Sequence, residues 1–490
     1  MTARKCSRAS VLCVAAALMG LAALSSACAT NPVTGRRELT LMSESQEIAL
    51  GKDSDAQIRQ EMGVYEAPEL QRYVSDIGLR MAKLSQRPSL PWQFTVVDQP
   101  AINAFALPGG FIYLTRGILP FLDDEAELAG VLGHEIGHVT ARHSAQQYTR
   151  AIGGQVGLVA LGVFVPAARP FGQASEQAMG LMFLKFGRDD ELQSDQLGAS
   201  YAAAGGWDPG GVPGMLSTLG RLAEASGDRK GVPNFLSTHP EPLARVSEVA
   251  PTVTKLRAGG ASFETGRARL VDRLAGLIYG DNPEQGLFRG QTFLHPPLRF
   301  RLDFPNGWTT ANSARQVMAQ APTGDAFLLL QLVEQPAGST IQDIAAASMR
   351  QAGLALTRGE RTSIGGLDAY LGTYQGQIEG LGEVTGRAAH FRYADKVYVI
   401  AGLAPPAAFQ QHLAAFDTSI RTFRSLSVAE AAAIKPARIE LYTARAGDTW
   451  QALAGRSGGA ITPAALATMN HAEPGGSPRA GAQLKIVVAG

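Results

Sequence analysis

Residues 123–140 have the sequence DDEAELAGVLGHEIGHVT, which combines a helix start with apolar residues at helical spacing. Asp123 is a plausible N-cap, because its carboxylate can accept a hydrogen bond from a free N–H of the first turn. We expect one long helix from Asp123 to about Tyr148. On that helix His134 and His138 lie four positions apart, so both imidazoles leave from the same face.

The segment His134-Glu135-Ile136-Gly137-His138 predicts a metal site. Two imidazoles on one helix face have the separation that a single zinc ion requires. Glu135 lies between them in sequence and can take a proton from a water molecule that the metal activates. We therefore expect one Zn²⁺ per chain and hydrolytic chemistry. The alternative is a pair of core or surface histidines that bind no metal.

The next residues exclude one class of zinc enzyme. A metzincin would carry a histidine six positions after His138, but Ser144 stands there. His143 lies on the other side of the helix from His138, which makes it a poor ligand. A third ligand must therefore come from elsewhere in the chain.

Glu191 is the better candidate for the third ligand, on a later helix. Asp195 lies one turn after it, where a carboxylate can hydrogen-bond a ligating imidazole from behind. We also expect Arg188, three residues before Glu191, to share that face. The alternative for this charged stretch is a solvated helix surface.

Composition limits the remaining chemistry. The 490 residues include 44 basic and 43 acidic side chains, a net charge of +1, so no nucleic-acid partner is expected. The three cysteines, Cys6, Cys13 and Cys28, all lie within the first 28 residues. Disulfides, thiolate-ligated zinc and cysteine nucleophiles are thereby excluded from the folded body.

Residues 1–27 have the pattern of a secretory signal, with basic residues followed by an apolar stretch from Val11 to Leu24. Residues Leu24 to Cys28 resemble a bacterial lipobox, which predicts that Cys28 is acylated and becomes the mature N-terminus. Ala29 then favours an outer over an inner membrane. We expect a periplasmic, lipid-anchored protein. The alternatives are an ordinary cleavage site and a retained membrane anchor.

The remaining pattern predicts an α+β multidomain chain. Residues 28–257 form a mostly helical domain with a small sheet, in which strands at 92–98 and 103–115 precede the motif helix. Later helices are expected at 176–204, 209–225 and 242–256. The parts that follow are a helical connector at 258–289, an α+β domain of unknown role at 290–427 and a linker at 428–437.

Residues 438–490 predict the order strand, helix, helix, strand. Asp448 and Thr462 stand at helix N-cap positions, and Pro463 follows at a first helical position. The segment resembles a LysM module, which implies binding of N-acetylglucosamine glycans such as peptidoglycan. The alternative is a small capping module without glycan affinity.

Four separated motifs resemble the gluzincin metallopeptidases that include the HtpX heat-shock protease, the CaaX prenyl protease and soluble periplasmic proteases of outer-membrane quality control. His134-Glu135-x-x-His138 with Glu191-x-x-x-Asp195 is the first of them. The other three motifs are the segments Asn31–Gly35, Asn103–Gly110 and Ser237–Pro240. The resemblance covers about residues 30–257, and prenylated substrates are not expected because the chain lacks multiple spans.

The resemblance implies a role for each matching residue. His134, His138 and Glu191 would bind zinc, and Glu135 would be the general base. His239 would either stabilise the oxyanion or occupy the fourth zinc position as a gate. An edge strand would bind an extended peptide substrate through Asn103, Ala104 and Phe105.

The sequence therefore predicts an envelope zinc metalloendopeptidase that hydrolyses peptide bonds of unfolded or misassembled proteins. Its partners would be polypeptide substrates, the membrane through Cys28, and peptidoglycan through residues 438–490. Two alternatives stay open: an envelope assembly factor or chaperone with a gated zinc site, and a peptidoglycan amidase or endopeptidase.

Overall fold

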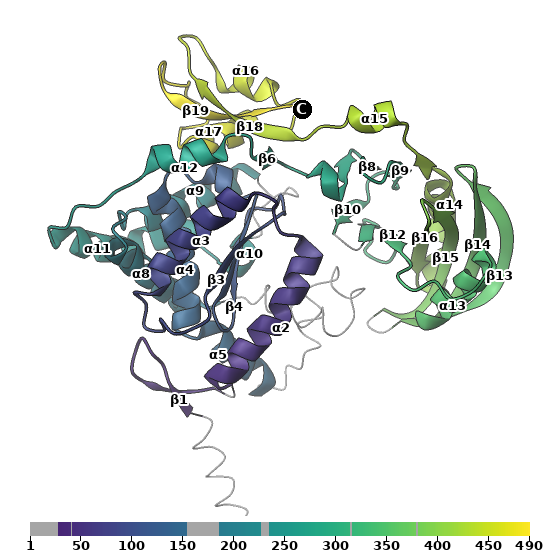
Figure 1. Cartoon of the computed structure of the whole chain (residues 1–490), viewed down its shortest axis with the longest axis horizontal. Helices are drawn as coiled ribbons and strands as arrows, with labels where there is room; N and C mark the ends of the chain where they lie inside the picture. The colour runs from purple at the N-terminus through teal and green to yellow at the C-terminus, as the bar shows by residue number, and fades with distance from the viewer. Residues whose placement is uncertain (1–27, 41, 154–185, 227–234, 314–315, 379–380) are drawn as a thin grey trace, which may run out of the picture.

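The computed structural model describes residues 28–40, 42–153, 186–226, 235–313, 316–378 and 381–490. The expected signal segment, residues 1–27, lies outside them, as does the first part of the helix expected at 176–204. Figure 1 shows a helix-rich body built from the first half of the chain and a separate β-rich body. The C-terminal segment returns to the helix-rich body. Because one body is mainly helical and the other mainly β-sheet, the α+β class expected from the sequence is confirmed.

The helix-rich body begins with a short hairpin and two helices that lead into a three-stranded sheet. These elements are β1 (Cys28–Thr30), β2 (Arg37–Leu39), α2 (Glu44–Met62), α3 (Pro68–Ala82), β3 (Gln93–Val97), β4 (Ala104–Leu107) and β5 (Phe111–Thr115). The sheet order is β3-β5-β4, so β4 is an edge strand, as the sequence predicts for this segment. Gly109 turns the chain between β4 and β5 with a φ of 83°, where a Cβ would meet Ile48 Cα at 2.7 Å.

Helices fill the remainder of this body. After the 3₁₀ turn η1 (Leu119–Phe121) they are α4 (Glu125–Thr140), α5 (His143–Gly153), α8 (Arg188–Ala204), α9 (Gly211–Ser226), α10 (Phe235–Thr238), α11 (Pro242–Ala258) and α12 (Arg267–Leu274). The single helix expected from Asp123 to Tyr148 is wrong in two respects: its N-cap is Asp124 and not Asp123, and the helix is broken after Thr140. Arg142 adopts a left-handed φ of 62°, which ends α4 at Thr140 and starts α5 in a new direction.

Helix α4 is buried along its whole length and packs closely on α8. Asp124 caps its start by accepting a hydrogen bond from the Glu127 N–H. Glycines allow the two backbones to approach, because a Cβ on Gly133 would lie 2.9 Å from Gly198 O. A Cβ on Gly198 would lie 2.8 Å from His134 N. This contact fixes the residues of α8 against those of α4.

The connector expected to be helical between residues 258 and 289 is only partly so. It contains α12, the strands β6 (Ile278–Tyr279) and β7 (Leu287–Arg289), and the 3₁₀ turn η3 (Pro283–Gln285). The buried Arg116 holds this segment against the helix-rich body, since its guanidinium donates to Ile278 O at 2.6 Å and Gly280 O at 2.8 Å.

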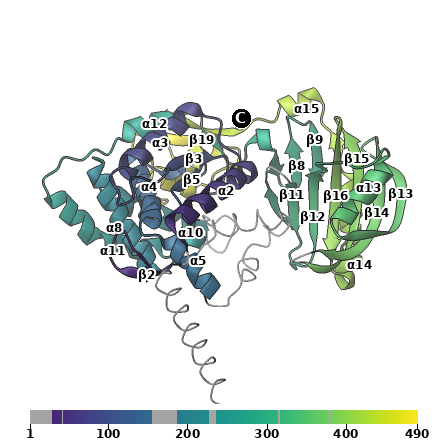
Figure 2. The same ribbon diagram turned by 60° about the horizontal axis from the view of Figure 1, so that its bottom comes forward.

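The β-rich body is built on a seven-stranded antiparallel sheet and has its own cores, which lie on both faces of that sheet (Figure 2). Its helices are α13 (Ile341–Gln351), which packs on one face, and α14 (Pro406–Arg421), which packs on the other. The sheet has the order β10 (Thr309–Asn312), β11 (Gln316–Gln320), β12 (Phe327–Leu332), β16 (Lys396–Ala404), β15 (Gly382–Tyr393), β14 (Leu367–Ile378), β13 (Leu354–Ile364). A second sheet has the order β17 (Arg424–Ser425), β9 (Phe300–Asp303), β8 (Thr292–His295), β7.

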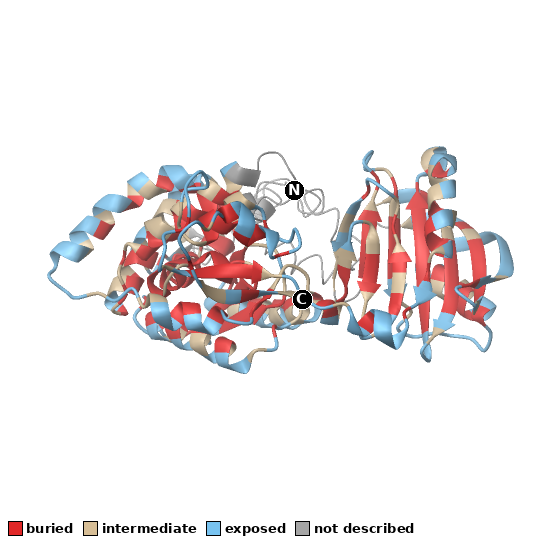
Figure 3. Cartoon of the chain, turned by 90° about the horizontal axis from the view of Figure 1, so that it is seen from above, coloured by how far each residue is buried: buried red, intermediate tan, exposed pale blue. Residues whose placement is uncertain are grey.

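The helix α15 (Val428–Ala432) leads from the β-rich body to the C-terminal segment. There the expected order is present, as β18 (Ala437–Thr443), α16 (Trp450–Gly455), α17 (Pro463–Met469) and β19 (Gln483–Val488). The segment does not stand apart from the helix-rich body. Strand β18 pairs with β6, and the segment's apolar residues belong to the same core as the α4 residues. Figure 3 shows buried residues on its strands, as on those of the β-rich body.

Candidate metal centre

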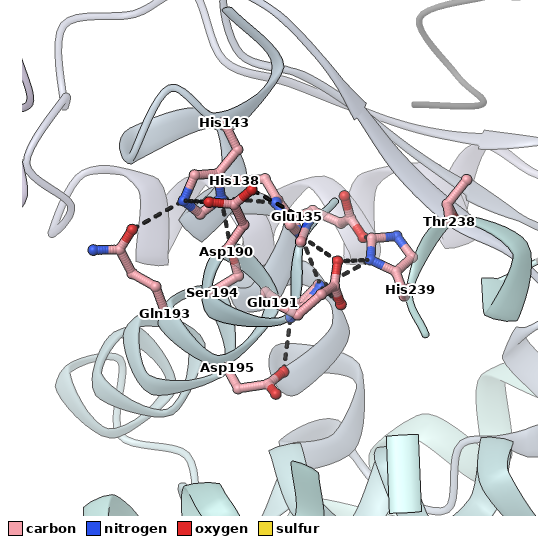
Figure 4. A network of polar contacts seen from close by, with 12 residues as sticks. Glu135, His138, His143, Asp190, Glu191, Gln193, Ser194, Asp195, Thr238 and His239 are labelled. Carbon is pink, nitrogen blue, oxygen red and sulfur yellow. Dashed lines mark hydrogen bonds and ion pairs between the residues drawn. The ribbon is translucent and has the colours of Figure 1, made fainter. Parts of the chain in front are cut away.

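Four donor side chains converge at the centre of the helix-rich body (Figure 4). His134 and His138 come from α4, Glu191 comes from α8, and His239 directly follows α10; their candidate ligand atoms all lie within 4.8 Å of one another. His134 Nε2 lies 3.0 Å from His138 Nε2 and 3.2 Å from His239 Nδ1, and Glu191 Oε1 lies 2.9 Å from His239 Nδ1. The i and i+4 placement predicted for the two histidines is confirmed.

The chemistry of these donors fits zinc. Imidazole and carboxylate groups are ordinary zinc ligands, and zinc usually takes four ligands, which is the number of donors present here. Burial lowers the pKa of His138 well below its usual range, so its ring is neutral and offers a lone pair. Burial acts to raise the pKa of Glu191, but the nearby His239 and His138 hold it well below its usual range. Several lone pairs and a carboxylate charge thus meet in a dry space, which a cation would stabilise.

A carboxylate behind His134 sets the orientation of that ring. Asp195 Oδ1 lies 2.8 Å from His134 Nδ1, which leaves Nε2 directed at the centre. The bidentate guanidinium of Arg245 donates to Asp195 at 2.7 and 2.8 Å. Arg245 also contacts Glu191, with Nη1 2.5 Å from Oε2. The expected contact between Asp195 and a ligating imidazole is present.

The structure does not bring Arg188 to the centre. Its side chain is 60% exposed and pairs with Glu248 at the surface, so the expectation that it joins Glu191 on the face toward the ligands is wrong. Arg188 is the first residue of α8, and its side chain leaves toward α11. The guanidinium beside the ligands belongs to Arg245, which the sequence reasoning missed. Its only sequence signal is its place shortly after His239.

His143 does not belong to the group of donors, in agreement with its exclusion as a ligand. It lies behind His138 instead, with the two Nδ1 atoms 2.9 Å apart. Its Nε2 lies 2.9 Å from Gln193 Oε1 on α8. The break at Arg142 produces this placement, because it brings the first residue of α5 back toward the last turn of α4. His143 thus orients the second histidine as Asp195 orients the first.

Glu135 lies at the edge of the donor group. Its side chain is 1% exposed, and Oε1 lies 3.6 Å from His239 Nε2. That oxygen has no hydrogen-bond partner among the described residues. Burial raises the pKa of Glu135, with His239 and His134 acting in the opposite direction. A carboxylate oxygen that lies beside the donor group, without a hydrogen bond from any described residue, is placed to exchange a proton with a bound water or amine.

The expected substrate strand runs next to this centre. Asn103, Ala104 and Phe105 are buried, and β4 contacts α4. Ile102 O, just before the strand, accepts a hydrogen bond from Phe235 N at 3.2 Å. Phe235 in turn stacks on the His239 ring with 4.3 Å between centroids. The edge strand and the His239 turn are therefore linked.

A helix-rich fold around a buried His, His, Glu and His set defines a zinc metallopeptidase. The family model described as peptidase family M48 matches residues 68–253, which contain all four donors and Glu135. These residues are an M48 metalloendopeptidase domain.

Known relatives match the same half of the chain. The β-barrel assembly-enhancing protease of Yersinia pestis is 30% identical over 234 residues, which cover 46% of this chain and 48% of that protein. The mitochondrial metalloendopeptidase OMA1 of Schizosaccharomyces pombe is 30% identical over 224 residues, which cover 44% of this chain and 64% of that protein. The match thus spans about half to two thirds of the relatives' lengths.

Among solved structures, a Pseudomonas aeruginosa protein of unknown function covers 25% of this chain and 88% of its own, at 20% identity. Its TM-score is 0.20, and no argument follows from a value that low. In the described part of the chain, no helix is both long and apolar enough to cross a membrane.

Proposed function

We propose that this chain is a zinc-dependent metalloendopeptidase of the bacterial cell envelope that cleaves unfolded or misassembled proteins. The observation that carries the proposal is the buried group of His134, His138, Glu191 and His239, with Glu135 Oε1 beside it and without a hydrogen-bond partner among the described residues. The matching relatives from bacteria are named for a role in β-barrel assembly, which supports an envelope substrate.

His134, His138 and Glu191 would hold the zinc ion, which when bound would supply a Lewis acid for the scissile carbonyl and would lower the pKa of water toward neutral pH. Glu135 accepts a proton from the attacking water while the water oxygen forms a bond to the carbonyl carbon. The same carboxyl then delivers that proton to the leaving amine as the C–N bond breaks. Asp195 keeps the lone pair of His134 Nε2 directed at the metal position by accepting from Nδ1.

His239 acts as a gate in this proposal. Catalytic zinc sites hold three protein ligands and leave one position for water or substrate, whereas this structure brings a fourth donor to the centre. His239 must therefore move away before a carbonyl can bind. Its position in the turn after the short helix α10 permits such movement, and once displaced its ring can donate to the oxyanion.

An extended peptide supplies the substrate backbone. Among the described residues β4 is the edge of its sheet, so one more strand could pair with its outer side once the groups that bury Asn103, Ala104 and Phe105 move aside. Only unfolded or flexible segments can adopt that conformation. The proposal therefore assigns substrate contacts to Asn103, Ala104 and Phe105.

The envelope location rests on the N-terminal sequence. A signal at residues 1–27 would direct export, and acylation of Cys28 would hold the chain at the periplasmic face of the outer membrane. The βααβ order of residues 438–490 supports a LysM-like segment that binds peptidoglycan, as a proposal additional to proteolysis.

A second candidate function is an assembly factor or chaperone whose zinc site stays closed. The four-donor arrangement, which leaves no position for substrate, is the observation that favours it.

The variant Glu135→Gln separates these two functions. It removes the base but none of the four donors, so we expect casein cleavage to fall by at least about 10²-fold with zinc content unchanged. Zinc would be measured by atomic absorption on the same preparations. Cleavage at the wild-type rate would contradict the peptidase mechanism, and an unaltered assembly phenotype would favour the chaperone. Muropeptides offered in parallel test an amidase.

A further inference from the structure

The hairpin of β1 and β2 contains the Asn31–Gly35 motif, to which the catalytic scheme gives no role. The turn is built on Asn31, whose Oδ1 accepts from Val33 N at 2.8 Å and from Thr34 N at 3.2 Å. Gly35 closes it with a left-handed φ of 67°. Asn31 is 2% exposed, although it lies in a two-stranded hairpin near the surface. Its burial shows that another element covers it.

That element is the junction between α4 and α5. Asn31 Nδ2 donates to Ala141 O at 3.2 Å and also contacts both oxygens of Glu38, at 3.0 and 3.1 Å. Gln146 on α5 bonds the same two acceptors, Glu38 Oε2 at 2.7 Å and Ala141 O at 3.0 Å. The hairpin, the end of α4 and the start of α5 thus share one hydrogen-bond network.

Two arginines hold the same junction from the other side. Arg87 Nη1 donates to Val139 O and to Glu47, both at 2.9 Å. Arg142 Nε donates to the other oxygen of Glu47 at 2.6 Å. The last carbonyls of a helix have no partner within the helix. Here they receive donors from segments far away in sequence, of which the hairpin is one.

The junction matters because it sets the distance between two histidines. His138 lies in the last turn of α4, and His143 is the first residue of α5. A change in the angle at Ala141 and Arg142 moves His143 away from His138, and the ligand loses the group that orients its ring.

We propose that Asn31 is a positioning residue of the peptidase, which fixes the Ala141 peptide and thereby keeps His143 behind His138. This inference rests on the proposed function and assigns a task to the hairpin that begins at Cys28. The amide of Asn31 does two things at once. Its side-chain oxygen accepts the two hydrogen bonds of the turn, and its side-chain nitrogen donates to Ala141 O at the end of α4.

The variant Asn31→Asp separates these two tasks in the full-length protein. Aspartate still accepts from the N–H groups of Val33 and Thr34, so the turn is kept. It cannot donate to Ala141 O, and it places a second carboxylate beside Glu38. We expect zinc affinity and kcat each to fall about tenfold with KM within twofold. Hydrogen exchange at residues 138–146 should rise.

Thr34→Ala is the matched control in the same turn. Thr34 is exposed, and among the described residues of the hairpin its hydroxyl accepts only from Arg36 N, so zinc affinity and exchange should stay at wild-type values. The double variant Asn31→Asp with Glu38→Gln removes the carboxylate repulsion. We expect it to restore hairpin stability but not kcat, because Ala141 O still lacks the Asn31 donor.

Wild-type zinc affinity and wild-type exchange at 138–146 in Asn31→Asp would overturn the assignment. If that variant does not fold, Asn31→Ser replaces it, since the serine hydroxyl retains a turn but is too short to reach Ala141 O. The same readings of zinc affinity and exchange then decide. A wild-type protein that cleaves no peptide would end the proposed function alone, because neither measurement depends on cleavage.

Discussion

At the residue scale, Arg245 is the one residue that contacts both Glu191 and Asp195 through its guanidinium among the described contacts of the metal centre. It is 0% exposed and its guanidinium bonds Asp195 through two nitrogens while it contacts Glu191 through a third. Two buried carboxylates that share one cation are both held in the charged form. The geometry requires a planar fork, which only arginine supplies.

We predict that Arg245→Lys lowers zinc affinity about 10- to 100-fold, because a single ammonium cannot bond both carboxylates and Asp195 then no longer fixes the His134 ring. Competition with a chromophoric chelator measures this. Arg188→Lys is the control, since that side chain is exposed and away from the donors. Equal loss of affinity in both variants would contradict the assignment.

The sequence predicted the ligands more reliably than the groups behind them. His134 and His138 follow from helix periodicity alone, because four residues make about one turn. Asp195 follows from Glu191 by the same rule. Arg188 satisfied that rule as well but stands at the first position of α8, where the side chain can leave toward solvent and α11. Arg245 obeys no local rule, since only the tertiary packing of α11 brings it to the centre.

At the element scale, the approach of α4 and α8 brings Glu191 to the two histidines. The sequence pattern did not predict this contact, because glycines inside a helical pattern ordinarily count against the helix itself. Here they remove the side chains that would separate the backbones. The break at Arg142 was also missed, because apolar spacing continues through it and one left-handed residue leaves no mark on the pattern.

We predict that Gly198→Ala destabilises the protein and weakens zinc binding. Alanine gains about 1 kcal/mol in helix propensity, but overpacking against backbone costs about 1–3 kcal/mol, and its Cβ would lie 2.8 Å from His134 N. Thermal unfolding with and without zinc measures both effects. Gly455→Ala on α16 is the control, because no heavy atom lies within 4 Å of its Cβ, and its stability should not fall.

In the β-rich body, we predict that the buried His390 makes the stability of the large sheet sensitive to acid. It is fully buried on β15, neither ring nitrogen has a partner among the described residues, and burial lowers its pKa from 6.5 to about 4. Between these values the unfolded chain binds a proton that the folded chain does not. The free energy of unfolding therefore falls as pH is lowered through this window, by about 3 kcal/mol.

His390→Leu should remove about half of the acid slope of this body, because leucine fills the site without a titratable group, whereas His295, whose pKa burial also lowers to about 4, still titrates in the variant. Denaturant unfolding at pH 7, 6, 5 and 4, followed for the β-rich body, measures the difference between the two proteins. Parallel slopes in the variant and the wild type would show that His390 is not the cause.

At the scale of the whole molecule, the C-terminal segment belongs to the peptidase body. Lys485, 0% exposed, donates to Leu122 O at 2.7 Å just before α4 begins. His471 lies 3.3 Å from Glu127 in the first turn of that helix. The sequence predicted the order of elements here but not their docking, since the residues that meet are more than 300 positions apart.

Truncation after Pro436 should therefore destabilise the zinc centre and not only remove a module. The cut exposes the core positions that Ile439, Trp450, Leu466 and Ile486 cover. Each buried apolar side chain is worth about 1.5–3 kcal/mol, against a total stability of about 5–15 kcal/mol. We expect a lower Tm and loss of bound zinc. A truncated chain with wild-type Tm and zinc content would show that the segment is independent.

The shared core also imposes an order in time. During synthesis the ligand residues leave the ribosome long before residues 437–490, and the β-rich body is made between them. The start of α4 gains its support from Lys485 and His471 only when that late segment arrives. A growing chain thus holds every ligand yet lacks a finished peptidase. On the proposed function, we therefore expect cleavage to begin only after β19 has joined the helix-rich body.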